Sequence, residues 1–206
     1  MARKSRTRFT VLGVLTLGPK SGYDIKNLIE RSVGNFWHES YGQIYPTLKQ
    51  LDADGLVSHR VEDQPGRPDR FVYRITSKGR QELRDWLVQP AAIEIPRHEL
   101  LLKLFFGTQV SVDANLKHLV RYRADVDTRI GQLNEGDRML REKYGDTEQG
   151  VYWLLTIRQG ILVNEALAQW CEEATTELER MKQRRRSEKR SSEREAGSGE
   201  RFPTPP

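Results

Sequence analysis

Polar side chains that can bond to a flat or anionic ligand gather on one predicted helix. Gln43, Lys49 and Gln50 fall on the same side of it, where glutamine can pair with a base edge and lysine can reach a phosphate. The opposite side of the helix is expected to be buried, because apolar residues recur on it at helical steps: Ile44, Leu48 and Leu51. Because amides at a helix N-terminus favour phosphate, this chemistry predicts a nucleic-acid contact.

Three residues of this helix, Tyr41, Tyr45 and Pro46, each allow two interpretations. The hydroxyls of Tyr41 and Tyr45 can reach phosphate or base, but both rings can equally be partly buried packing residues. Ser40 and Gln43 have the spacing of a capping box, which predicts a helix start at that point. Pro46 is tolerated only in a first turn, so either the helix begins later than Ser40 or its first turn is irregular.

A polar loop between two predicted strands supplies a second group of candidate contacts. Gly66-Arg67-Pro68 suits the tip of a wing, where Arg67 can enter a minor groove or be only a loop cation. Arg70 and Lys78 follow and can meet the DNA backbone. Arg8 closes a run of cations at the N-terminus, which is either a solvated tail or an arm on DNA.

The elements that position these residues are predicted from hydrophobic spacing and helix-capping residues. A helix is expected over Arg8–Leu17, a second after Ser21 with Asp24 as capping partner, a third over Tyr41–Ala53, strands over Leu56–Val61 and Arg70–Ile75, and a fourth helix to about Val88. Three short helices before a two-stranded hairpin have the order of a winged helix-turn-helix, whose recognition helix lies in the major groove.

The remainder is predicted to be helical. Two prolines in Gln89–Pro96 mark a boundary, after which Leu100–Phe106 form a short apolar helix. From Ser111 a long helix has a 3.5-residue apolar period, and a last helix runs from about Glu148 to Gln183. The apolar residues expected to make a dimer interface are Leu116, Leu119, Val126, Ile130, Leu133, Leu154 and Ile161.

Composition restricts the class of protein. The net charge is +5, and residues 1–90 hold 15 Lys and Arg against 10 Asp and Glu, so a basic head precedes an acidic body. There is one cysteine and no apolar run long enough to span a membrane, which together favour the cytoplasm. The four histidines lie in separate segments and there is no Gly-rich phosphate loop, so neither an enzyme nor a cofactor or metal is expected.

Five ordered motifs carry a family resemblance. They are Gly22-Tyr23-Asp24-Ile25, the run from Tyr41 to Leu51, Asp54-Gly55-Leu56-Val57, Gly66-Arg67-Pro68, and the run from Tyr73 to Gly79. In these residues the chain closely resembles the PadR family of bacterial transcriptional regulators. Ser21 departs from the family pattern, which often has histidine before Gly-Tyr.

The resemblance implies a mainly α protein with a small β-hairpin wing, and a dimer that binds a near-palindromic DNA operator with two heads. It also implies repression relieved by a small, often aromatic, effector. The layout after residue 97 is similar to the larger subgroup, whose helical C-terminal domain swaps helices across the dimer. An effector pocket is expected where the linker and Leu100–Phe106 meet the head, or between subunits near Trp153 and Trp170, although filling core is the more common role of such tryptophans.

The expected organisation is a DNA-binding domain over residues 1–89, a dimerisation domain over 97–183 and a disordered charged tail over 184–206. The residues expected to contact DNA are Arg8, Tyr41, Gly42, Gln43, Tyr45, Pro46, Lys49, Gln50, Gly66, Arg67, Pro68, Arg70 and Lys78. The alternative function is a protein-interaction adaptor, since winged helices also bind proteins. An adaptor would lack the steep salt dependence of DNA binding.

Overall fold

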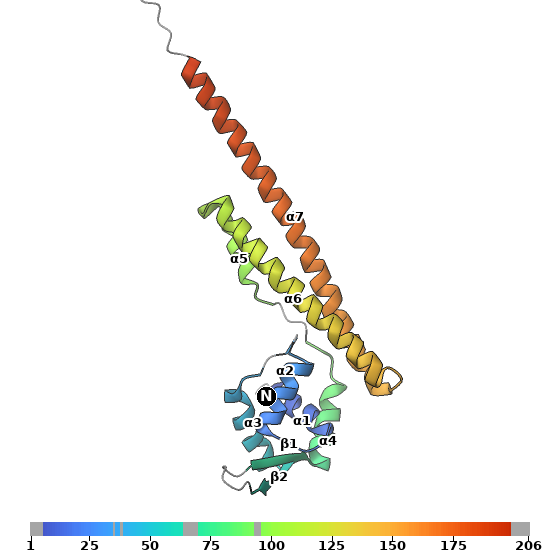
Figure 1. Ribbon diagram of the computed structural model, residues 1–206. Coiled ribbons are helices and arrows are strands. Elements are labelled where there is room, and N and C mark those ends of the chain that lie inside the picture. The colour runs from blue at the N-terminus through green and yellow to red at the C-terminus, as the bar shows by residue number, and fades with distance from the viewer. Residues whose placement is uncertain (1–5, 35, 38, 64–69, 93–95, 199–206) are drawn as a thin grey trace, which may run out of the picture. The chain divides into compact units, whose positions relative to one another are not determined.

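The chain divides into two compact units, Met1–Glu94 and Ile95–Pro206. The computed structural model describes residues 6–34, 36–37, 39–63, 70–92 and 96–198, and in two places (41 and 189) and over 193–198 only the backbone is described. We call the first unit the head and the second the helical unit. Figure 1 shows the elements of both.

The described residues of the head form four helices and a small antiparallel sheet. Its elements in chain order are α1 (Arg6–Thr16), β1 (Lys20–Ser21), α2 (Gly22–Ser32), α3 (Tyr41–Ala53), β2 (Val57–Glu62), β3 (Arg70–Ile75) and α4 (Ser77–Leu87). The predicted winged helix-turn-helix order is therefore confirmed. The described apolar core is formed mainly by α1, α2 and α3, and its fully buried side chains include Leu12, Leu15, Ile25, Ile29, Ile44, Leu48 and Leu51.

The sheet has three strands where the sequence predicts two. Strand β3 lies in the middle, with β2 on one side and the two-residue β1 on the other. In the hairpin Val57 pairs with Ile75 and Glu62 with Arg70, and β1 adds the pair of Lys20 with Tyr73. Strand β1 is too short to show the alternating pattern from which strands are predicted.

Local signals in the sequence explain where α2 begins and where α3 ends. The backbone N–H of Asp24 donates to Ser21 Oγ over 3.2 Å and Ser21 N–H donates to Asp24 Oδ2 over 3.1 Å, which is a complete capping box. Helix α3 is followed by Gly55 with φ 69°, a left-handed conformation that favours glycine and turns the chain into β2.

The helical unit is an antiparallel pair of long helices preceded by short ones. It contains α5 (Glu99–Phe105), a 3-10 turn η1 (Gly107–Gln109), α6 (Val112–Tyr144) and α7 (Glu148–Ser198). The predicted 3.5-residue stripe of α6 packs along α7 of the same chain, with Leu119, Val126 and Leu133 buried. Arg123, which interrupts that stripe, donates to the carbonyl of Ala168 over 3.0 Å and pairs with Glu172.

The C-terminal segment differs from the prediction. Disorder was expected from Arg184, but α7 continues to Ser198, and residues 199–206 lie outside the described residues. The reason is that low hydrophobicity and helix propensity are separate properties. Arg, Lys, Glu and Gln are good helix formers even where they bury nothing, and the first glycine after Arg184 is Gly197.

Among the helices that the structure describes, none combines the length and apolar character that crossing a lipid bilayer requires.

The close packing of α4 on the start of β2 predicts a large effect at Gly79. A Cβ added there would lie 2.1 Å from the carbonyl oxygen of Leu56, so the backbone must move. We expect Gly79→Ala to lower the free energy of unfolding by about 2 kcal/mol or more in urea. Gly13→Ala is the matched control, because its Cβ meets nothing within 4 Å in α1 and should add about 0.5–1 kcal/mol. Equal stability of the two variants would contradict this packing.

Candidate nucleic-acid interface

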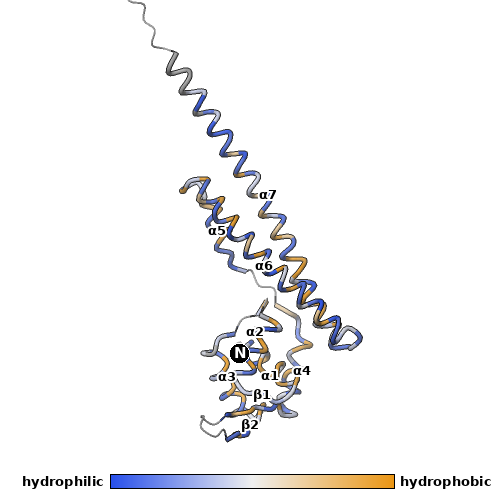
Figure 2. The backbone as a smooth tube through the Cα atoms, in the orientation of Figure 1, coloured by the Kyte–Doolittle hydropathy of each residue, from blue (hydrophilic) through white to orange (hydrophobic). Residues whose placement is uncertain are grey.

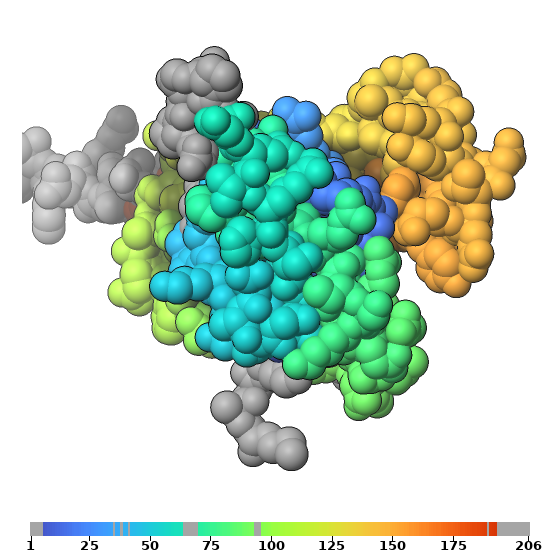
Figure 3. All heavy atoms as spheres, turned by 90° about the horizontal axis from the view of Figure 1, so that it is seen from below, coloured from blue at the N-terminus to red at the C-terminus, as the bar shows by residue number. Residues whose placement is uncertain are grey.

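Helix α3 has one buried side and one exposed side. Ile44, Leu48 and Leu51 have no exposed surface, because they pack in the head core. The described side chains on the other side, at Gln43, Tyr45, Pro46, Lys49 and Gln50, are all exposed, as is Gly42. In Figure 3 α3 (light blue) and strands β2 and β3 (turquoise) reach the surface on one face of the head. The structure thus brings these six predicted residues together. The side chain of Tyr41 lies outside what is described.

The N-terminal turn of α3 is held by Gln43. Its Oε1 accepts from the backbone N–H of Ser40 over 3.0 Å and from the Ser40 hydroxyl over 2.9 Å. The helix begins at Tyr41 and continues through Pro46, so of the two alternatives a late start is wrong. Proline lacks the N–H that would bond to the carbonyl of Gly42, four residues earlier. The hydrogen bonds between Gln43 and Ser40 therefore contribute more to ordering this turn than they would if residue 46 had an N–H.

The ring of Tyr45 is packed on one side and exposed elsewhere. Its side chain is 49% exposed, and an added Cβ at Gly22 would lie 2.7 Å from Tyr45 Cε1. The ring therefore covers the first residue of α2, which explains why the segment before Tyr23 has a glycine. The packing interpretation of Tyr45 is therefore supported where its ring meets Gly22, and its contact with DNA stays a prediction.

Glu39, which the sequence did not single out, anchors the start of α3 to α1. It is only 8% exposed, and Oε2 accepts from Thr7 Oγ1 over 2.9 Å. Its Oε1 accepts from Trp37 Nε1 over 2.7 Å and from Thr10 Oγ1 over 3.5 Å. These donors are neutral and come from two segments, and a buried carboxylate needs them because an unpaired one is costly. The position directly before a helix cap was the only signal in the sequence.

Arg8 does not lie with the other candidate residues. Its Nε donates to Glu82 over 2.6 Å and its Nη2 to Asp54 over 2.9 Å, and its side chain is mostly buried. Burial alone would lower the pKa of Arg8, but the hydrogen bonds to both carboxylates raise it. Arg8 therefore ties α1 to α4 and to the end of α3, and the expectation of an N-terminal arm ending in a DNA contact is wrong for this residue.

The wing is described only at its two strands. Gly66, Arg67 and Pro68 lie outside the described residues. At the start of β3, Arg70 forms an ion pair with Asp24 in the α2 cap. Burial acts to raise the pKa of Asp24, but hydrogen bonds from Ser21 and from Arg70 lower it. The guanidinium thus fastens the wing to α2, which limits its use as a phosphate contact.

Lys78 also has an intramolecular partner, since its Nζ donates to the carbonyl of Asp54 over 2.8 Å. This places a cation at the C-terminal end of α3, where helix carbonyls carry negative partial charge. Lys78 remains exposed, so its contact with DNA stays a prediction.

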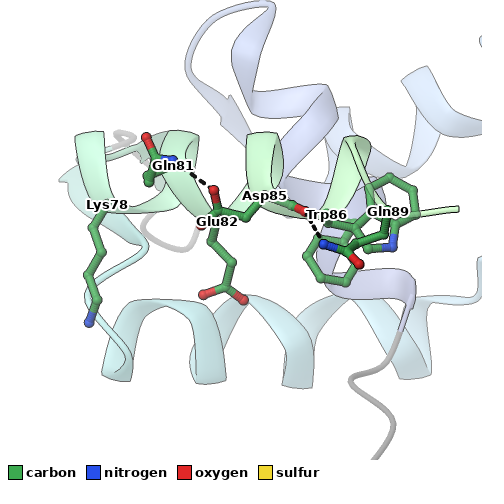
Figure 4. A pocket seen from close by; sticks show the side chains of 7 residues that line it. Lys78, Gln81, Glu82, Asp85, Trp86 and Gln89 are labelled. Atoms are coloured by element: carbon green, nitrogen blue, oxygen red, sulfur yellow. Dashed lines mark hydrogen bonds between the residues drawn. The ribbon is translucent and has the colours of Figure 1, made fainter.

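A shallow cavity of about 420 Å³ lies against α4. Figure 4 shows Lys78 and Glu82 projecting from α4 to the same side, with Trp86 and Gln89 at the other end. The indole of Trp86 stacks on Phe9, with ring centroids 4.6 Å apart and planes 6° apart. Neither place predicted from the sequence contains this cavity. Trp153 instead makes an edge contact with Tyr144 at 5.1 Å, in the helical unit.

The predicted dimer residues are mostly used within one chain. Leu119, Val126, Leu133 and Ile161 are buried between α6 and α7, and Leu116, Ile130 and Leu154 are partly buried. A 3.5-residue period predicts that a helix pairs, but it does not say with which chain. The apolar side chains that stay exposed in the helical unit lie elsewhere, and they include Leu101, Leu102, Phe105, Phe106, Tyr152, Leu155, Leu162 and Val163.

Two family models match the chain, one in each unit. The model described as the transcriptional regulator PadR-like family matches residues 11–85, and the one described as virulence activator alpha C-term matches residues 96–179. The matches therefore include both α3 and the α6–α7 pair.

Two curated relatives are similar in sequence. The negative transcriptional regulator PadR of Bacillus subtilis is 37% identical over 100 residues, which is 48% of this chain and 55% of that protein. The probable transcriptional regulator Rv1176c of Mycobacterium tuberculosis is 27% identical over 173 residues, which is 77% of this chain and 90% of that one.

Solved structures share the fold. Bacillus subtilis PadR in complex with operator DNA is similar with a TM-score of 0.74 and 26% identity, covering 84% of this chain and 99% of that one. The same regulator in complex with p-coumaric acid is similar with a TM-score of 0.69 and 25% identity, covering 85% and 99%.

Proposed function

We propose that the protein binds a near-palindromic DNA operator as a dimer and represses transcription until a small aromatic effector releases it. The chain belongs to the PadR-like family of transcriptional regulators, and the proposal starts from this membership. The observation that carries the proposal is the exposed polar side of α3. That side offers amides and a cation on a rigid helix, which is the chemistry of major-groove recognition.

The contacts within the head suggest separate roles for the residues of α3. Gln43 Oε1 is engaged at the cap, so its amide nitrogen is the group left to donate to base acceptors such as guanine O6 or N7. Lys49 is exposed in the middle of the helix and suits a phosphate. Gln50 donates to Asp54 Oδ1 over 2.8 Å, which holds its side chain along the helix.

Lys49→Gln tests whether α3 meets phosphate. For a dimer with one phosphate contact per Lys49, the slope of log K against log salt should become shallower by about 1.8, because each contact contributes about 0.9. The measurement is a salt titration of binding to the duplex upstream of the protein's own gene. Lys117→Gln is the control, since it removes the same charge from an exposed position of α6. Equal slopes for all three proteins, or no binding of duplex DNA at low salt, would favour the adaptor alternative.

The dimer is proposed to form through the exposed apolar side of α7. Tyr152, Leu155 and Leu162 lie on one side of this helix, opposite the side that packs on α6. Leu155 is 62% exposed and Phe105 of α5 is 81% exposed. An apolar surface of this kind, on a helix already covered on its other side, supports association with a second copy.

Leu155→Glu is expected to separate the dimer, because a carboxylate at an apolar interface is left without a partner. The mass measured by light scattering should fall by half at micromolar concentration, and operator affinity should fall with it. Glu165→Gln, an exposed change farther along α7, is the control and should leave the mass of the dimer unchanged. A monomeric wild-type protein, or a dimeric Leu155→Glu variant, would contradict the proposal.

The cavity beside α4 supports the effector part of the proposal. Trp86 can stack on a planar ring, and Lys78 can pair with a carboxylate at the other end. The cavity is shallow and open to solvent, and Glu82 and Asp85 also line it, so the carboxylate of a bound ligand must lie at the Lys78 end. Because p-coumaric acid is the ligand in a structurally similar regulator, it is the first probe.

Titration with p-coumaric acid should quench tryptophan fluorescence to a plateau. The Trp86→Phe variant should lose most of this saturable quenching, while the fluorescence of Trp37, Trp153 and Trp170 remains. The same acid should weaken binding to the upstream duplex. Quenching that persists in Trp86→Phe would place the ligand elsewhere, and no quenching would mean that this cavity does not take a phenolic acid.

A further inference from the structure

Helix α7 is much longer than the helix it packs against. It has 51 residues against 33 in α6, and the two run antiparallel after a short turn. Lys182 of α7 pairs with Asp113 in the first turn of α6. Beyond Lys182, α7 therefore has no further turn of α6 beside it. In Figure 1 the red part of α7 continues past this point. We call residues 183–198 the C-terminal extension.

The C-terminal extension lies outside the packed part of the helical unit. All of its described side chains, at residues 183–188 and 190–192, are exposed. The segment has no Leu, Ile, Val, Met or aromatic residue, and in Figure 2 the stretch of α7 that comes just before its grey end is mostly blue. It holds six Arg and Lys against three Glu, in contrast to the acidic stretch of residues 91–180.

The cations of the C-terminal extension are not evenly distributed around the helix. At 100° per residue Arg185, Arg186 and Arg190 fall within an arc of about 140°, with Glu193 inside that arc and Glu188 and Glu195 outside it. Arg184 and Glu188 share the other side. Among the described side chains of this segment, none of these three arginines takes part in an ion pair. Arg186 is attracted to Asp113 of α6, which also pairs with Lys182, so the repulsion among the three arginines is only partly offset within the chain and an anionic partner can relieve the rest.

The absence of apolar side chains decides between kinds of anionic partner. A helix that inserts into a membrane interface or lies in the groove of a protein buries an apolar side, and the C-terminal extension has none, which argues against these two kinds of partner. A row of arginines on a helix about 24 Å long, at 1.5 Å per residue, instead matches the regularly spaced phosphates of a duplex, to which guanidinium groups bind in a bidentate manner.

We propose that the C-terminal extension is a second DNA-binding element, which contacts the phosphate backbone of duplex DNA without reading its sequence. This inference rests on the proposed function, because it adds a contact to a protein that already binds DNA through α3. Phosphate contacts raise affinity equally for all sequences, whereas α3 supplies the discrimination between them. The charge of the extension would also offset the acidic character of the rest of the helical unit.

The test uses the full chain with Arg185, Arg186 and Arg190 replaced by Gln, which keeps helix propensity and removes three charges. We expect the slope of log K against log salt to become shallower by about 2.7 if one extension of the dimer engages DNA and by about twice that if both do. Affinity should fall at least tenfold at 0.1 M salt for the upstream duplex and for a scrambled duplex alike, so that their ratio stays unchanged.

The control variant replaces Lys117, Arg121 and Arg129 of α6 by Gln, which removes the same charge from exposed positions. It should keep the wild-type slope, and circular dichroism and light scattering should give wild-type values for both variants. A triple-arginine variant with the wild-type slope, or a loss equal to that of the control, overturns the inference while leaving the proposed function intact. A wild-type protein that binds neither duplex overturns both.

Discussion

The packing of one side of α3 into the head core is the interaction on which the rest of the structure depends. Ile44, Leu48 and Leu51 are fully buried, and each such side chain contributes about 2 kcal/mol relative to exposure. Their burial sets the rotation of α3 about its own axis, which turns the polar side outward. The direction in which Lys49 points is therefore a consequence of apolar burial, and DNA recognition depends on residues that never touch DNA.

Polar contacts at the edge of this core fix the position of α3 along its axis. Glu39 ties the residue before the helix cap to the hydroxyl of Thr7 in α1, while the ring of Tyr45 lies over Gly22 of α2. Asp24, in the cap of α2, in turn holds Arg70 at the start of the wing strand. Helix α3 and the start of strand β3 are thus both in contact with α2, which supports the proposal that α3 and β3 meet a duplex on one face of the head.

Much of the head could be predicted because its signals are local. Ser21 and Ser40 mark helix starts, and the buried stripe of α3 follows from its period alone. The partners of Arg8 could not be predicted, since Glu82 lies 74 residues away and nothing in a single sequence pairs the two. The 3.5-residue period of α6 indicated a helical partner without identifying it, whereas the apolar residues on more than one side of the last helix indicated that it packs against the long helix of the same chain. Low hydrophobicity predicts disorder from Arg184, but the helix propensity of Arg, Lys, Glu and Gln extends α7 to Ser198.

The most direct test of the account is methylation protection of guanine N7, an atom in the major groove, across the DNA upstream of the protein's own gene. With two α3 helices held as a pair, the protein should protect N7 in two patches about 10 bp apart, centre to centre. Protection of minor-groove adenine N3 with every guanine N7 still reactive would contradict the claim that the exposed side of α3 enters the major groove.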